Sequence, residues 1–352
     1  MTEEWWPELA PVIEPTVAEK PPYRVVDVHT HLSVPAAEEI ARPFYRPEYE
    51  PRVRYSSAQT LRYNREYRAS ERQTRQFEDA EARLADMDKQ GVDLQVLAVP
   101  PSEYFYWLDK EQALKASRTQ HERFAEVVAR YPDRFAAVAN PPMNHPELAV
   151  EVLREARDLG FNGFEMSADV VGADLDHPRF DVVWEAAAEL EMTAIMHPQG
   201  FTHGERMTDY YLVNVMCMPL ASALATTRMI LGGVWRRHPG FRMVVVHGGG
   251  YLPFYFARTD HAYAVRPELR GQIDRPPSDY LRELYFDTNV FDPGMVRHLV
   301  AEFGAEHVLL GTDYPFDMGT VDPLAFIERV GLDEQARRLV LGGNAARLLR
   351  LG

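Results

Sequence analysis

Short runs of apolar, mostly β-branched residues alternate along the chain with longer segments in which apolar residues recur every three or four positions. This alternation is typical of βα units, in which helices join parallel strands. Eight strands with helices between them favour a single (β/α)₈ barrel, the TIM-barrel fold, over an open sheet. The approximate bounds of the predicted strands are Tyr23–Val28, Val92–Val99, Phe135–Asn140, Gly163–Met166, Thr193–Met196, Arg242–Val246, Leu284–Asp287 and His307–Leu310.

The segments between these runs predict helices. Pro146 near the start of one segment and Gly160 just after its end occupy the positions that proline and glycine prefer at helix ends. The expected helices are Glu78–Gln90, Glu111–Tyr131, Pro146–Leu159, Phe180–Leu190 and Pro219–Arg237.

Two connections are too long to be simple turns. Ser33–Phe77 follows the first strand and Gln199–Pro219 follows the fifth, so both leave the carboxyl ends of strands, where barrel enzymes build their sites. We expect residues 1–22 to form an N-terminal extension and residues 23–352 to form one barrel with residues 33–77 as an insertion. The insertion is either a solvated loop or a lid or dimer arm, and the sequence leaves these alternatives open.

Composition narrows the class of protein. The chain has 352 residues, of which 46% are hydrophobic, and this suits a globular protein with a large core. A net charge of −15 without a basic run disfavours nucleic acid as a partner. The single cysteine, Cys217, excludes an intramolecular disulfide framework. Because neither a signal peptide nor a long apolar segment is evident, we expect a soluble, cytoplasmic protein that does not bind membranes.

The segment Asp27-Val-His29-Thr-His31 ends the first predicted strand and carries the strongest chemical signal. Residues two apart in a strand point the same way, so both imidazoles face the mouth of the barrel. Two neutral imidazoles on one side form half of a zinc-type coordination shell. A His-x-His pair alone would be weak support for a metal site.

Three more candidates end other strands. His197 follows the fifth, His247 the sixth and Asp313 the eighth. Each alone could be a capped, hydrogen-bonded residue at a strand end. Because four strand ends supply such groups to one face of the barrel, the sequence predicts a metal site there.

The motifs His29-Thr-His31, Met-His197-Pro, His247-Gly-Gly-Gly and Gly-Thr-Asp313-Tyr-Pro-Phe resemble the amidohydrolase superfamily. They are most similar to its branch containing aminocarboxymuconate semialdehyde decarboxylase and the resorcylate and carboxyvanillate decarboxylases. The resemblance runs from about residue 23 to the C-terminus. It implies that His29, His31, His197 and Asp313 bind the metal and that His247 is the catalytic histidine. It also implies a homodimer, because Arg258 matches an arginine that binds the substrate carboxylate in the neighbouring subunit.

One departure from the superfamily bears on the metal count. Members with two metals carry a bridging lysine at the end of the fourth strand, where this chain has Gly163-Phe-Glu165-Met-Ser167. We therefore expect one divalent ion, with Zn²⁺ favoured and Mn²⁺ also compatible with the ligand set. His247 is then free for acid–base work, and Glu165 is expected to support the site or pair with an arginine rather than bind the metal.

The residues that would bind the substrate are harder to place. Arg72 or Arg75 could take the place of the second carboxylate-binding arginine of the branch, or both could be solvated residues at the start of a helix, because the spacing does not match cleanly. Trp107, in an aromatic cluster after the second strand, could flank a planar substrate or only pack beneath a loop. Asp287, at the end of the seventh strand, is expected to orient a ligand histidine or to cap a helix.

These features lead to a functional hypothesis. We expect a metal-dependent, non-oxidative decarboxylase of a small unsaturated or aromatic carboxylic acid that carries hydroxy or amino substituents. Metal-bound water, His247 and Asp313 would transfer the proton. The alternative is a hydrolase or hydratase of a small carboxylate-bearing lactone, amide or unsaturated acid, because the same groups serve either reaction. A barrel that binds metal and ligand without turnover would not need His247.

Overall fold

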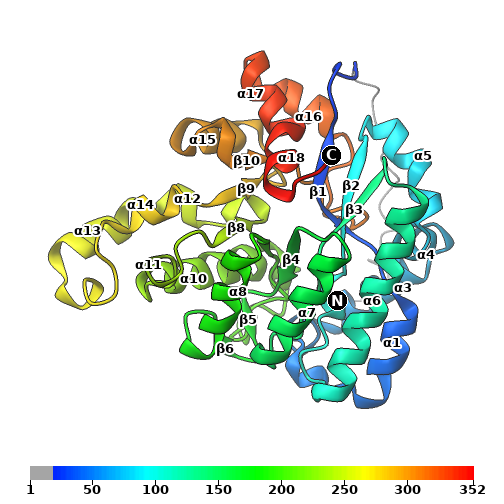
Figure 1. Ribbon diagram of the computed structural model, residues 1–352, viewed down its shortest axis with the longest axis horizontal. Coiled ribbons are helices and arrows are strands. Elements are labelled where there is room, and N and C mark those ends of the chain that lie inside the picture. The colour runs from blue at the N-terminus through cyan, green and yellow to red at the C-terminus, as the bar shows by residue number, and fades with distance from the viewer. Residues whose placement is uncertain (1–18) are drawn as a thin grey trace.

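The computed structural model describes residues 19–352, so most of the predicted N-terminal extension lies outside the described residues. Parallel strands alternate with helices through this range (Figure 1). The strands of the main sheet are β1 (Val26–His31), β2 (Leu94–Ala98), β3 (Phe135–Ala137), β4 (Gly163–Met166), β7 (Thr193–Met196), β8 (Arg242–Val245), β9 (Tyr285–Asp287) and β10 (Val308–Leu309). They agree with the predicted strands to within three residues at each end. A short antiparallel hairpin, β5 (Asp169–Val170) and β6 (Ala173–Asp174), follows β4.

The strands form a ring. Continuous parallel ladders run in the orders β1-β2-β3 and β4-β7-β8-β9-β10. Backbone hydrogen bonds close both gaps: Ala139 N–H donates to Gly163 at 2.9 Å, and Val28 N–H donates to Leu310 at 3.0 Å. The predicted (β/α)₈ barrel is thereby confirmed.

Alternation along the strands divides the core into two layers. Side chains such as Val28, Val96, Ile195 and Val244 pack together inside the ring. Their sequence neighbours face the surrounding helices, as period-two geometry requires. The sequences of the strands are continuous apolar runs because both faces of each strand are buried.

Helices follow the strands as expected, and two of the five predicted helices differ from the observed bounds by more than one residue. Asp79 caps α5, its carboxylate accepting from Glu81 N–H at 2.9 Å, so this helix begins at Ala80 instead of Glu78. Gly233, at φ +74°, separates α10 from α11 where one helix was predicted. The outer helices are α5 (Ala80–Gln90), α6 (Lys110–Arg130), α7 (Pro146–Asp158), α8 (Asp181–Glu189), α10 (Cys217–Leu231), α11 (Val234–Arg237), α15 (Pro293–Phe303), α16 (Pro323–Val330), α17 (Glu334–Arg338) and α18 (Asn344–Leu349).

The insertion after β1 is largely helical. It contains α1 (Pro35–Ala41), α2 (Pro51–Arg54), α3 (Ala58–Ala69) and α4 (Glu71–Glu78). It packs on the other long connection, which follows β7 and holds α9 (Leu212–Val215): Ser57 N–H donates to Thr208 at 3.1 Å, and the Tyr55 hydroxyl donates to Thr202 at 2.9 Å. The two long connections therefore meet over the carboxyl end of the barrel.

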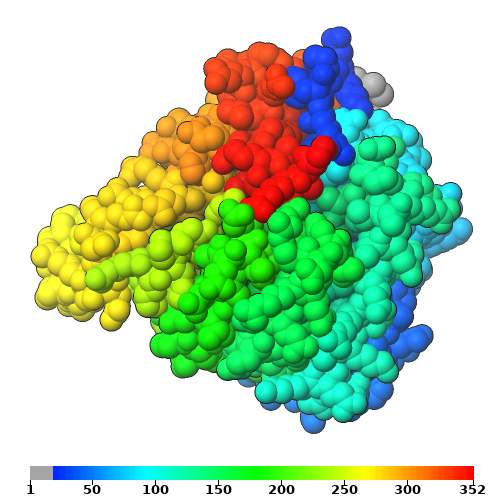
Figure 2. Space-filling view, in the orientation of Figure 1, coloured from blue at the N-terminus to red at the C-terminus, as the bar shows by residue number. Residues whose placement is uncertain are grey.

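A segment after β8 extends away from the barrel. It holds α12 (Leu252–Tyr255), α13 (Ala257–Val265) and α14 (Pro277–Leu281). Figures 1 and 2 show α13 projecting from the body of the molecule. Tyr255 and Val265 on this segment are 70% and 58% exposed, so it presents apolar side chains to the surroundings.

One stretch in the described part of the chain, Leu212–Leu231, has the length and hydropathy of a membrane-spanning helix by composition alone. Half of that window is buried inside the protein. The stretch comprises α9 and α10, which lie between β7 and β8 and pack on the barrel through residues such as Ala225 and Met229. Its apolar character is that of a core helix.

Candidate functional site

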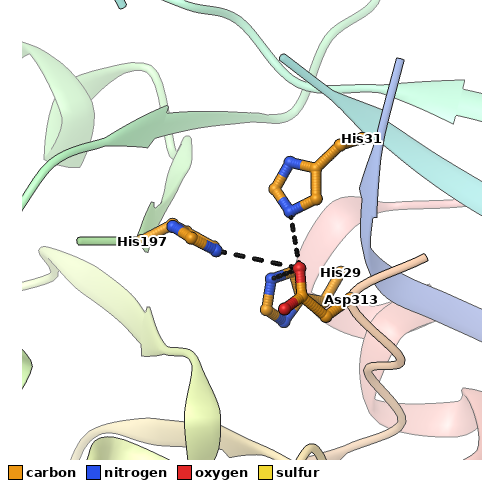
Figure 3. A group of neighbouring side chains, drawn as sticks. All are labelled: His29, His31, His197 and Asp313. Carbon is orange, nitrogen blue, oxygen red and sulfur yellow. Dashed lines mark hydrogen bonds and ion pairs between the residues drawn. The ribbon is translucent and has the colours of Figure 1, made fainter. Parts of the chain in front are cut away.

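Four side chains converge at the carboxyl end of the barrel (Figure 3). His29 and His31 come from the end of β1, His197 directly follows β7, and Asp313 lies four residues after β10. Their nearest ligand atoms all lie within 4.8 Å of one another, and all four residues are buried. The structure thus brings together the four residues that the sequence predicted as metal ligands.

The polar atoms of this cluster fit a divalent cation. Asp313 Oδ1 lies 3.0 Å from His31 Nε2, 3.3 Å from His29 Nε2 and 3.9 Å from His197 Nε2. The Nε2 atoms of His29 and His197 are buried and have no hydrogen-bond partner among the described residues. An unsatisfied buried polar atom costs about 1–3 kcal/mol, and coordination of a cation would offset that cost. Three imidazoles and one carboxylate suit zinc or manganese.

The electrostatics favour the protonation states that coordination requires at His197 and Asp313, but not at His29. Burial lowers the pKa of His197 well below its ordinary value, so its imidazole is neutral. Burial opposes a charge on Asp313, but the neighbouring histidines outweigh it and hold the pKa well below the ordinary value. Burial likewise opposes a charge on His29, yet Asp313 and Asp287 raise its pKa, so a proton and a metal compete for this ligand.

Strained backbone positions two of the functional side chains. His247 has φ +55° and Asp313 has φ +63°, in the left-handed region that costs such residues about 1–3 kcal/mol. Gly248 follows at φ +60°, and a Cβ there would lie 2.3 Å from Val290 Cγ1. Only glycine fits at that position, which accounts for part of the His-Gly-Gly-Gly sequence after β8.

His247 lies beside the metal cluster. Its Nε2 is 3.6 Å from Asp313 Oδ2, and its ring centroid is 5.0 Å from that of His197. Its Nδ1 is buried and unpartnered within the described range. His247 is therefore within reach of the ligand cluster and of a small molecule bound there.

Asp287 connects two parts of the site, and of its two predicted roles the contacts fit the orientation of a ligand histidine. One carboxylate oxygen lies 2.6 Å from His29 Nδ1, and the other accepts from Gly248 N–H at 2.8 Å. The first contact leaves His29 Nε2 directed at the metal position. The second holds the turn that carries His247.

We expect Asp287→Asn to weaken metal affinity by about 10–100-fold, because an amide supports the basicity of His29 less well than a carboxylate does. The change keeps the size of the side chain, so the fold should be retained. Equilibrium dialysis against buffered Zn²⁺ and Mn²⁺ would measure the effect, with Asp292→Asn at an exposed helix cap as the control. Unchanged affinity in Asp287→Asn would show that the contact with His29 does not matter for the metal.

Two adjoining cavities lie next to the cluster. The smaller one touches the metal side and is lined by His197, His247 and Asp313 among others. The larger has a volume of about 320 Å³ and lies between the insertion and the connection after β7. Both are lined by Arg52, Tyr211, Phe316 and Asp317, which form the boundary between them.

None of the predicted substrate-binding residues lines either cavity within one chain. Arg75 is exposed on α4, as is Arg72, and Arg258 is exposed on α13. Trp107 is partly buried, with its ring centroid 5.6 Å from that of Tyr45, so within one chain it packs beneath the insertion.

Two other arginines, which were not predicted as substrate-binding residues, line the larger cavity. Arg52, from α2, lines both cavities, and its guanidinium has no ion pair or hydrogen bond with the described residues. Arg68, from α3, donates to Ser33 Oγ at 3.0 Å and lies 3.7 Å from the ring centre of Phe77. The available signal was the concentration of arginine, tyrosine and proline in the insertion.

Glu165, at the end of β4, is buried close to the cluster but is not one of the four converging donors. Burial raises its pKa well above the ordinary value, and this favours the neutral carboxylic acid. A neutral acid would be a poor substitute for the anionic bridge that a second metal needs.

The sequence of this chain is similar to those of known proteins. Residues 26–351 match the amidohydrolase family. The chain is 32% identical over 276 residues to 2-amino-3-carboxymuconate-6-semialdehyde decarboxylase from Dictyostelium discoideum, covering 78% of this chain and 77% of that protein. It is 28% identical over 306 residues to gamma-resorcylate decarboxylase from Rhodococcus jostii, covering 80% and 90% of the two chains.

A more distant relative is named as a hydratase instead of a decarboxylase. The chain is 24% identical over 262 residues to 2-keto-4-carboxy-3-hexenedioate hydratase from a Sphingobium species, covering 68% of this chain and 73% of that protein. Among solved structures, 5-carboxyvanillate decarboxylase from Novosphingobium aromaticivorans, with bound manganese, superimposes with a TM-score of 0.82 at 20% identity. That match covers 96% of this chain and all of the other, and it supports the fold.

Proposed function

We infer that this chain, which belongs to the amidohydrolase family, is a metal-dependent carboxy-lyase that removes carbon dioxide from a small unsaturated or aromatic carboxylic acid. The observation that carries the inference is the buried cluster of His29, His31, His197 and Asp313 with His247 beside it. Of the relatives reported above, the two with the highest sequence identity to this chain are both decarboxylases.

The reaction breaks the bond between the carboxylate and its neighbouring carbon, leaves the electron pair on that carbon, and replaces the carboxylate with a proton. A divalent ion held by the four ligands would supply Lewis acidity that polarises a substrate oxygen. His247 is the proton carrier, because an imidazole can accept a proton at one nitrogen and donate one from the other, and its ring borders the smaller cavity. Asp313 lies near enough to stabilise the protonated ring of His247.

Arg52 orients the carboxylate that leaves. It lies at the boundary between the two cavities, with its guanidinium carbon 5.7 Å from the ring centre of Phe316. A planar guanidinium that forms no ion pair or hydrogen bond with the described residues is suited to hold a carboxylate through two parallel hydrogen bonds. Phe316 would offer a ring face or edge to a planar substrate, a role first considered for Trp107.

Arg52→Met is expected to lower kcat/KM for decarboxylation by about 10–150-fold, since a hydrogen-bonded charge contributes about 1.5–3 kcal/mol. Steady-state rates of carbon dioxide release would measure the loss. Arg54→Met is a matched control, because Arg54 belongs to the same helix but lines neither cavity. Equal losses in both variants would mean that the insertion was disturbed rather than that a carboxylate contact was removed.

The finer assignments belong to the same proposal. One ion per chain is expected because Glu165 stands where a bridging lysine would lie, with Zn²⁺ favoured and Mn²⁺ compatible. We also propose a homodimer in which α13 brings Arg258 to the partner's site, supported by the projection of α13 and the exposed Tyr255. We propose further that the insertion forms a lid over the site. The enzyme is proposed to be cytoplasmic. Light scattering after size exclusion would contradict the dimer if it gave the mass of one chain.

The overall proposal is tested by assaying carbon dioxide release from a panel of acids. The panel contains 2,6-dihydroxybenzoate, 5-carboxyvanillate and 2-amino-3-carboxymuconate-6-semialdehyde, with chelator-treated protein as the control. Release of carbon dioxide that disappears on chelation and returns with added metal is the expected result. Hydration or hydrolysis of panel members without carbon dioxide would favour the reaction of the hydratase relative.

A further inference from the structure

The connection after β7 contains a strained turn at two consecutive tyrosines, Tyr210 and Tyr211. Leu212 N–H donates to the carbonyl of Asp209 at 3.0 Å and closes the turn. The two central residues have positive φ angles of 56° and 60°. Turns with two positive φ angles favour glycine and asparagine, because most other side chains are strained there. Such strain is concentrated at functional sites, so the two tyrosines call for an explanation.

The turn places the two rings in different surroundings. Tyr210 is 88% exposed and lines neither cavity. Tyr211 is partly buried and lines both cavities, together with Arg52 and Phe316 at the boundary between them. Asn214 N–H, in α9, donates to the carbonyl of Tyr211 at 2.9 Å, so the helix that follows holds this residue in place.

The hydroxyl of Tyr211 is not used inside the protein. It has no hydrogen-bond partner within residues 19–352 and is not one of the buried atoms that lack a partner, so it has accessible surface. Burial raises the pKa of Tyr211 to about 12, Arg52 lowers it, and Asp317 and Asp313 raise it further. These three charged residues all line the smaller cavity. Because charges shift a pKa mainly at short range, the hydroxyl lies toward the metal side of the site.

These properties suit a hydrogen-bond donor to an anion. With a pKa near 12 the phenol keeps its proton at neutral pH, so it can donate and carries no charge that would repel a carboxylate. Arg52, at the same boundary, can occupy only part of the acceptor capacity of a carboxylate. Asp317 and Asp313 place negative charge around the smaller cavity, so a second donor beside Arg52 would help to hold an anion there.

We propose that the hydroxyl of Tyr211 donates a hydrogen bond to the leaving carboxylate of the substrate, beside Arg52, and that the strained turn serves to present it. The proposal rests on the proposed function, since it takes the carboxylate at this boundary to be the one that is removed. Carbon dioxide is uncharged, so the hydrogen bond weakens as the carboxylate departs. Tyr211 therefore contributes to binding of the acid and not to proton transfer.

Binding to the metal-loaded protein tests the contact apart from turnover. Two pairs of probes each differ in the one carboxylate that decarboxylation removes: 2,6-dihydroxybenzoate with resorcinol, and 5-carboxyvanillate with vanillate. Titration calorimetry would use His247→Asn protein, in which turnover is expected to be slow. With Tyr211 present, at least one acid should bind more tightly than its product. Adding Tyr211→Phe should weaken that acid by about 10–150-fold, as expected for a hydrogen bond to a charged group, and leave the affinity for the product unchanged.

Steady-state kinetics with His247 intact separates binding from proton transfer. For an acid that releases carbon dioxide, Tyr211→Phe should raise KM without a fall in kcat, because the lost contact stabilises the bound acid rather than the transition state. Tyr210→Phe is the matched control, since Tyr210 belongs to the same turn and also has a positive φ but lines neither cavity. A fall in kcat with KM unchanged in Tyr211→Phe would overturn the proposal.

Three binding results would also overturn it. Equal weakening of acid and product in Tyr211→Phe would assign Tyr211 a structural role. Unchanged affinity for the acid would show that the hydroxyl does not contact the carboxylate. A protein that bound neither acid more tightly than its product would have no carboxylate site for Tyr211 to complete.

The two proposals fail separately. Carbon dioxide release with unchanged binding of the acid in Tyr211→Phe would reject the role of Tyr211 and leave the decarboxylase standing. Binding of an acid that depends on Tyr211, in a wild-type protein that releases no carbon dioxide from it, would support the contact with the carboxylate and reject the reaction.

Discussion

Replacing His247 with asparagine is expected to lower kcat for decarboxylation by about 10²–10⁴-fold, the usual contribution of a positioned proton carrier. The four metal ligands are untouched by this change, so the variant should still bind one divalent ion per chain. Asparagine retains a polar side chain but cannot act as a general acid or base. Turnover should therefore fall without a matching loss of metal.

The measurement pairs carbon dioxide release with metal analysis of the same sample. His298→Asn is a suitable control, because His298 is partly buried on α15 and lines neither cavity. If His247→Asn lost its metal along with its activity, His247 would be a ligand rather than a proton carrier. Full activity with metal retained would remove His247 from the mechanism.

Asp313→Asn should have the second large effect, because Asp313 is the only carboxylate among the four ligands. We expect metal affinity to fall by at least about 100-fold, the upper end of the loss seen when a partner of a ligand is replaced. Turnover should stay low even when added metal restores occupancy, because Asp313 also lies 3.6 Å from His247. The single substitution would remove both the anionic metal ligand and the carboxylate beside His247.

Titration with metal while activity is followed separates these contributions. Asp333→Asn, at an exposed helix cap, should leave both quantities unchanged. Complete recovery of turnover at saturating metal would show that Asp313 only binds the ion. Unchanged metal affinity would remove Asp313 from the ligand set.

The barrel and its metal ligands could be predicted from the sequence for one physical reason. Strands buried on both faces read as apolar runs, so a polar residue that ends such a run is conspicuous. His29, His31, His197 and Asp313 each follow a run of this kind, and parallel strands bring their carboxyl ends to one face. Asp287 could be placed by the same reasoning.

The residues that line the larger cavity could not be predicted in this way. Its arginines lie on helices of the insertion, where periodicity shows which residues share a face but not which cavity that face lines. Arg75 is exposed on α4, whereas its neighbours Gln76 and Phe77 are buried. Arg52 enters the site because Gly200 lets the connection after β7 approach α2 closely. That contact joins residues almost 150 positions apart in the sequence, so it cannot be predicted from the pattern of neighbouring residues.

The fate of solvent atoms during turnover tests the central claim most directly. Metal-loaded protein would be incubated with an active acid in deuterium oxide enriched in ¹⁸O, and the products would be analysed by mass spectrometry. A decarboxylase should release one carbon dioxide per product and place one deuterium on the carbon that lost the carboxylate, without new solvent oxygen on the product skeleton. A product that keeps every carbon and gains the elements of water would contradict the account.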